Sequence, residues 1–208
     1  MTSLTLASKS PARLATLRSA GIEPTVQVSD VDEPATLARA EDSHGPLAAE
    51  DVALLLARAK CEAVAAKVEE DTLVLGCDSV LEVDGEVHGK PADVAEATDR
   101  WHRMRGRSGV LHSGHWLIDE REDGTGATLG AVASTTVHFA KLSDEEIEAY
   151  VASGEPLHVA GGFTIDGLGG AYVTGIEGDH HNVVGVSLPL LRELLGELDI
   201  PWHDLRTP

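Results

Sequence analysis

The sequence LVLGCDSVLEV, residues 73–83, decides how the rest of the chain is interpreted. Its first three apolar residues predict a buried strand, and we expect that strand to end near Asp78. The apolar residues that follow lead into Asp84-Gly85, a dipeptide typical of a hairpin turn. The return strand is followed closely by Lys90. A carboxylate and an ammonium group on one hairpin therefore predict a site that handles phosphate.

The bulk composition is that of an ordinary globular protein. The 208 residues are 42% apolar and 25% charged, so we expect a single domain spanning residues 1–208. The net charge of -19 argues against a nucleic-acid surface, which needs a basic stripe. No apolar run approaches the roughly 20 residues that a membrane helix requires. The two cysteines suggest no disulfide framework. The first residues lack the pattern of a signal peptide, and we expect a cytoplasmic protein.

The segment ahead of the hairpin offers a second phosphate-binding element. A short strand at residues 4–7 leads into a helix for which Ser10 is the expected N-cap and Pro11 the first residue. Free N–H groups at such a helix start attract anions, and Lys9 and Arg13 add positive charge there. The alternative is a plain capped helix with two solvated cations, which these residues by themselves favour.

Two further charged positions have open interpretations. The carboxylates that follow a predicted strand at residues 26–29 include Glu33, and they form either a metal ligand set or an acidic surface turn, which the composition favours. We expect residues 34–46 to be a loop. Lys60 lies at the edge of the apolar face of a helix expected over residues 47–68. Its amine either points into a cleft or extends to solvent, and the periodicity favours solvent.

The remaining pattern completes a mixed α/β fold. We expect helices at 91–104 and 143–152, long paired strands at 111–120 and 127–141, a glycine-rich stretch at 154–186 and a last helix capped by Ser187. Together these elements predict a mixed, twisted central sheet flanked by helices, with a smaller antiparallel lobe and a cleft between them. The histidines at 112, 115, 180 and 181 lack zinc-ligand spacing, and we expect no metal site from them.

Six short motifs in order resemble the Maf family of nucleotide pyrophosphatases along nearly the whole chain. The motifs are LASKSPAR at 6–13, ARAK at 57–60, GCDS at 76–79, GKP at 89–91, YVASGEPL at 150–157 and GLG at 167–169. Glu33 and VVG at 183–185 extend the likeness.

The resemblance implies hydrolysis of a nucleoside triphosphate to a monophosphate and pyrophosphate, with Mg²⁺ or Mn²⁺ as the divalent metal. It suggests a homodimer. By the same resemblance, Asp78 is the catalytic base and a metal ligand with Glu33, and the substrate is bound by Ser8, Ser10, Arg13, Lys60, Lys90 and Asp166.

Several positions depart from the family pattern, Arg107 and Ser108 among them. Ala12 stands where an arginine is usual, His158 belongs to a replaced charged pair, and Asp166 replaces a glutamine that resembles a base-contacting residue. These departures bear on nucleotide preference. The alternative function is a non-catalytic nucleotide-binding regulator of septum formation, since the family is also associated with inhibition of septation.

Overall fold

One mixed sheet runs through the molecule. The computed structural model describes residues 2–69 and 71–206. Its seven strands are arranged in the order β2-β1-β3-β5-β6-β7, with β4 paired to β3. They are β1 (Leu4–Leu6), β2 (Thr25–Val26), β3 (Thr72–Val83), β4 (Glu86–His88), β5 (Ser108–Glu120), β6 (Thr128–Phe139) and β7 (Val173–Glu177). The pairings β2-β1 and β1-β3 are parallel and the others antiparallel, so the predicted mixed α/β sheet is confirmed.

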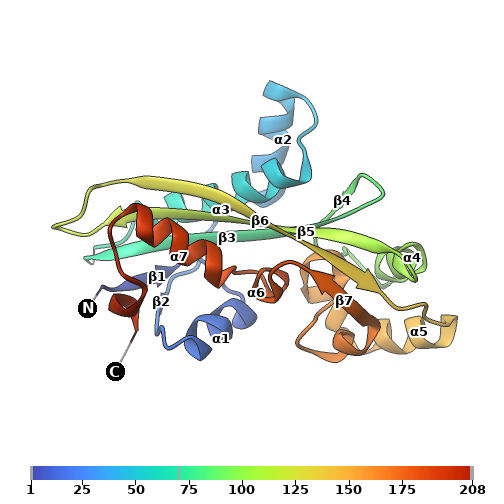
Figure 1. Ribbon diagram of the computed structural model, residues 1–208. Coiled ribbons are helices and arrows are strands. Elements are labelled where there is room, and N and C mark those ends of the chain that lie inside the picture. Colours follow the sequence, from blue (N-terminus) through green and yellow to red (C-terminus); the bar gives the residue numbers. More distant parts are fainter. Residues whose placement is uncertain (1, 70, 207–208) are drawn as a thin grey trace.

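Helices cover both faces of this sheet. The α-helices are α1 (Pro11–Ser19), α2 (Glu33–His44), α3 (Ala49–Ala65), α4 (Val94–Met104), α5 (Asp144–Ala152), α6 (His180–Val184) and α7 (Leu188–Glu197). Short 3-10 helices lie at Glu155–His158, Ala160–Gly162, Leu168–Tyr172 and Trp202–Leu205. In Figure 1, α2 and α3 lie on one side of the long strands, while α1, α6 and α7 lie on the other. Among the described residues, no helix is long and apolar enough to cross a membrane.

Two apolar cores lie at opposite ends of the long strands. The first surrounds Leu73, Leu75 and Leu117 and takes in the buried face of α7. The second surrounds Trp101 of α4, whose ring packs edge-on against Phe139 and Tyr150. Because the strands β3, β5 and β6 cross both cores, they fix the distance between the two ends of the molecule.

Local sequence signals fix most helix starts. The side chains of Ser10, Ser143 and Ser187 each accept a hydrogen bond from a backbone N–H in the first turn of α1, α5 and α7, as N-caps do. The expected loop at 34–46 is wrong, because α2 occupies Glu33–His44 and is capped by Asp32. None of its residues is fully buried, and Leu37 is the residue of this helix that packs against the apolar cluster around Val52 and Leu56.

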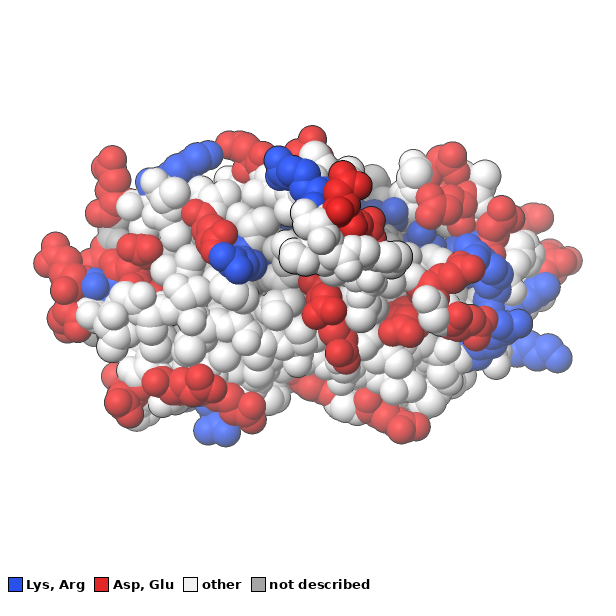
Figure 2. All heavy atoms as spheres, turned by 90° about the horizontal axis from the view of Figure 1, so that it is seen from above, with Lys and Arg blue, Asp and Glu red and all other residues white. Residues whose placement is uncertain are grey.

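The surface reflects the acidic composition. Figure 2 looks onto the side of α2 and α3, where acidic side chains lie around much of the rim and basic side chains gather toward the end at which α4 lies. Arg103 of α4 and Arg105 just after it pair with Glu86 and Asp144 at 2.7 and 2.5 Å. These cations are therefore already offset by carboxylates.

Candidate active site

Asp78 lies in the middle of β3, just beyond the point where the neighbouring strand β1 ends. The expectation that the strand ends near this residue is wrong, because β5 pairs with β3 from Thr72 to Glu82 and carries the strand past it. The parallel neighbour β1 is paired with β3 only as far as Leu75. Beyond that residue one flank of β3 is without β1, and the buried Asp78 follows within three residues.

Two glycines let α3 approach the sheet closely beside Asp78. A Cβ atom on Gly76 would lie 2.7 Å from Cys61 Cβ and would overlap the carbonyl oxygen of Ala57. A Cβ atom on Gly114, which pairs with Asp78 in the sheet, would overlap the backbone of Ala53 in the same helix. Since the side chains at 76 and 78 share one face of the strand, this close contact places the carboxylate of Asp78 under α3.

Lys60 of α3 joins the two predicted metal-binding carboxylates. Its Nζ donates a hydrogen bond to Asp78 and lies 2.8 Å from Glu33 Oε1. The lysine side chain is only 12% exposed, so the interpretation of Lys60 as a solvent-directed lysine is wrong. The three groups carry a combined charge of -1 when ionised, and the structure brings them together as a partly buried cluster.

The cluster perturbs the ionisation of both acids. Burial raises the pKa of Asp78, while the charges of Lys60 and Arg13 act in the opposite direction. Burial also opposes ionisation of Glu33, yet the hydrogen bond from Lys60 and the charges of Lys60, Lys90 and Lys9 lower its pKa. The pKa of Asp78 is therefore raised and the pKa of the neighbouring Glu33 is lowered. Lys9, which the sequence placed with Arg13 at a phosphate-binding helix start, is thus among the charges that act on this cluster.

Arg13 is buried and binds the protein through most of its guanidinium. Nε donates to Gly185 O and Nη1 to Cys77 O, both at 2.8 Å. Nη2 donates to Ser79 Oγ at 3.0 Å and Nη1 to Ser8 Oγ at 3.3 Å. Four of its five N–H groups thus have partners among the described residues, so Arg13 holds α1, β3 and the turn after α6 together. Its contact with substrate stays a prediction.

The start of α1 is built from the two predicted serines. Ser10 Oγ accepts a hydrogen bond from Arg13 N at 3.4 Å, and Ser8 Oγ accepts one from Ser10 N at 3.2 Å. These contacts order the turn that carries Lys9. Substrate binding by either serine stays a prediction.

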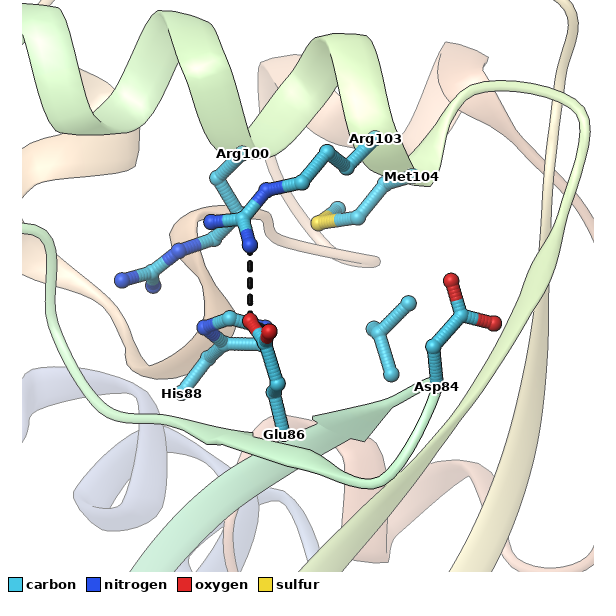
Figure 3. A pocket seen from close by; sticks show the side chains of 7 residues that line it. Asp84, Glu86, His88, Arg100, Arg103 and Met104 are labelled. Carbon is cyan, nitrogen blue, oxygen red and sulfur yellow. Dashed lines mark hydrogen bonds and ion pairs between the residues drawn. The ribbon is translucent and has the colours of Figure 1, made fainter.

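Lys90 lies just after β4, on a segment anchored from α4. Gly89 O accepts hydrogen bonds from Arg100 Nη1 at 2.6 Å and from Gly161 N at 3.0 Å. Figure 3 shows Arg100 and Arg103 of α4 facing the β3–β4 hairpin, with Arg103 paired to Glu86. The hollow between them, which His88 also lines, has a volume of about 60 Å³, far below the several hundred Å³ of a nucleotide pocket. It therefore serves to seat the hairpin.

Asp166 lies on an exposed turn that Glu155 organises. The Glu155 carboxylate accepts hydrogen bonds from Tyr150 Oη at 2.8 Å and Thr164 Oγ1 at 2.6 Å. It also accepts the backbone N–H groups of Leu168 and Gly169, both at 2.9 Å. The sequence did not predict this role, because Glu155 was identified only as part of the motif at 150–157. A base contact by Asp166 stays a prediction.

The fold and the lysine–carboxylate cluster define an α/β protein with a site suited to phosphate chemistry. The family model of Maf-like proteins matches residues 3–198. The chain belongs to the Maf-like protein family.

Curated relatives support the same family over the whole chain. One from Salinispora tropica is 59% identical over 202 residues, covering 95% of this chain and 84% of the relative. One from Leifsonia xyli is 54% identical over 205 residues, covering 97% and 95%. Both relatives are named nucleoside triphosphate pyrophosphatase. A solved structure of the Staphylococcus aureus Ham1 protein aligns with 67% of this chain and 73% of its own at a TM-score of 0.41 and 16% identity, which is too distant to bear on the site.

Proposed function

We propose that this chain hydrolyses a nucleoside triphosphate to the nucleoside monophosphate and pyrophosphate. The single observation that carries the proposal is the bridge from Lys60 to Asp78 and Glu33, with the charges of Lys9 and Lys90 acting on the same cluster. The names of relatives that are 54–59% identical support the same reaction.

The reaction needs positive charge around the triphosphate and a base for water. Water oxygen attacks the α-phosphorus, the bond from that phosphorus to the bridging oxygen breaks, and pyrophosphate leaves with the electron pair. Lys9, Lys60 and Lys90 offset the charge that builds on the phosphate oxygens. The raised pKa of Asp78 suits it to accept the proton that the water loses.

The residues present also fit a divalent metal ion. Asp78 and Glu33 offer hard carboxylate oxygens, and Mg²⁺ prefers one or two carboxylates together with phosphate oxygens. These two residues would hold Mg²⁺ or Mn²⁺, and the bound ion supplies charge stabilisation at the phosphates.

The test is pyrophosphate release by purified protein from a panel of standard and modified nucleoside triphosphates with Mg²⁺ or Mn²⁺. Asp78→Asn should lower kcat at least a hundredfold, because general-base catalysis typically contributes about 10² to 10⁴ in rate. Asp51→Asn is the matched control, since Asp51 is exposed on α3. Full activity in Asp78→Asn would contradict the assignment. Tight nucleotide binding by the wild type without any pyrophosphate release would favour the non-catalytic regulator instead.

Three associated properties are inferred with this function. We infer a cytoplasmic homodimer that acts on free nucleotides and does not bind nucleic acid, consistent with the net charge of -19. Light scattering of the purified protein measures its oligomeric state. A monomeric mass at working concentration would contradict the dimer and leave the hydrolytic proposal standing.

A further inference from the structure

Asp179, His180 and His181 bring one carboxylate and two imidazoles together where α6 begins. One candidate ligand atom from each residue lies within 4.8 Å of the other two. Asp179 Oδ1 is 3.1 Å from His181 Nδ1 and 4.0 Å from His180 Nδ1. Ligand atoms bound at about 2.0–2.2 Å to one ion lie about 3 to 3.5 Å from each other. The separation between Asp179 and His181 falls in that range, where the two side chains now share a hydrogen bond, and the separation between Asp179 and His180 is longer.

The carboxylate of this cluster is held in place by the backbone around it. Asp179 Oδ1 accepts the N–H of His181 at 3.0 Å, and Asp179 O accepts the hydroxyl of Thr135 at 3.0 Å. Its second oxygen, Oδ2, is buried and has no well-formed hydrogen bond within the described part of the chain. A buried carboxylate oxygen without a well-formed hydrogen bond is rare in native proteins.

The two imidazoles are packed as a pair and differ in exposure. Their ring centroids are 3.7 Å apart with an interplanar angle of 38°. The His180 side chain is 63% exposed, whereas the His181 side chain is about half as exposed. The His180 ring is therefore the more accessible of the two imidazoles to solvent.

The donor set selects the class of ion. Imidazole nitrogens with a carboxylate favour borderline dications such as Zn²⁺, Co²⁺ and Ni²⁺, whereas Mg²⁺ and Ca²⁺ prefer oxygen ligands alone. We propose that Asp179, His180 and His181 form a binding site for a transition-metal dication of the Zn²⁺ type. The site shares no residue with the cluster around Asp78 and Glu33, and it does not depend on the proposed hydrolysis. The proposal departs from the sequence-based expectation of no metal site at His180 and His181, which rested on ligand spacing along the chain.

Isothermal titration calorimetry of metal-free protein with Zn²⁺ tests the site, and we expect a dissociation constant in the low micromolar range. His180→Gln is the diagnostic variant, because an exposed side chain can be changed with little effect on folding. His203→Gln is the matched control, since His203 is 77% exposed and lies 3.6 Å from the carboxylate of Asp204, and these two residues belong to no three-ligand group within residues 2–69 and 71–206. We expect His180→Gln to weaken Zn²⁺ binding at least tenfold and His203→Gln to leave it unchanged.

Two further measurements test whether Zn²⁺ binds at the catalytic carboxylates instead and whether imidazole nitrogens are its ligands. Asp78→Asn should retain the wild-type Zn²⁺ affinity, which separates this site from any metal held by the catalytic carboxylates. Absorption of the Co²⁺-loaded protein should show bands of nitrogen coordination that His181→Gln removes. The proposal is overturned if His180→Gln binds Zn²⁺ as the wild type does, or if His180→Gln and the control His203→Gln lose affinity equally. Binding only at millimolar Zn²⁺ would also overturn it.

Discussion

Substituting Gly76 by alanine should separate α3 from the sheet and disable the site at once. The added Cβ would lie 2.7 Å from Cys61 Cβ and 2.9 Å from Cys61 N, and it would overlap the carbonyl oxygen of Ala57. Ordinary carbon–carbon contacts are about 3.5 to 4.0 Å, so the helix must move by about 1 Å. The opposing atoms belong to helix backbone and a Cβ, and no side-chain rotation relieves the overlap.

The size of the effect follows from that displacement. Inserting one methyl group into a packed core typically costs about 1 to 3 kcal/mol. The same shift would carry Lys60 away from Asp78, which is buried and relies on it as a partner. Leaving a buried charge without its partner adds to the loss. We therefore expect Gly76→Ala to lower the free energy of unfolding by about 2 kcal/mol or more and to lower pyrophosphate release at least tenfold.

Urea unfolding monitored by far-UV circular dichroism measures the stability change. Gly196→Ala is the matched control, because a Cβ at that position of α7 has no other atom within 4 Å. There the substitution should raise stability by about 0.5 to 1 kcal/mol through helix propensity. A Gly76→Ala protein with the wild-type urea midpoint and wild-type activity would refute the claim that close packing of α3 builds the site.

Three further changes test single groups. The buried His115 accepts the N–H of Ser187 on Nε2, and burial lowers the pKa of His115 to about 4. Because the unfolded chain binds this proton near pH 6.5, the free energy of unfolding should fall by about 3 kcal/mol as the pH drops from about 6.5 to 4. His115→Gln should flatten the dependence of the urea midpoint on pH over that range. Hydrogen bonds from Arg121 lower the pKa of Asp119 to about 2, so Asp119→Asn should cost about 1 to 2 kcal/mol at pH 7 and the difference from wild type should vanish as the pH falls from about 4 to 2. Asp166→Gln should change the ranking of nucleotide substrates more than the overall turnover, and an unchanged ranking in the same panel would contradict a base contact.

The parts of the fold that were predictable are those with local causes. Ser10, Ser143 and Ser187 cap helices through bonds that span three residues, and the sequence shows such caps directly. The strand β7 (Val173–Glu177) was hidden in a glycine-rich stretch, since only pairing with the distant β6 makes it a strand. The helix α2 was hidden for a different reason: none of its residues is fully buried, so its sequence shows little apolar periodicity.

The site shows the same division. The position of Lys60 at the edge of an apolar face was predictable, but its partners were not, since Glu33 and Asp78 are distant in sequence and meet it only in the fold. Periodicity describes which face of a helix is buried and says nothing about which charge the sheet presents there. The family motifs supplied the residues, and the structure supplied their contacts.

The difference in strand length explains why a charged cluster can exist inside this sheet. β1 is three residues long and β3 is twelve, so Asp78 lies beyond the end of one neighbour while β5 still holds the strand straight. The space that β1 leaves is approached by Arg13 from one face of the sheet and by Lys60 from the other. Buried ion pairs contribute little net stability, because desolvation offsets their attraction. A cluster of two carboxylates and one ammonium, with the charges of Lys9 and Lys90 also acting on it, is therefore poorly explained as a stabilising device. Its arrangement suits the binding of a highly charged anion.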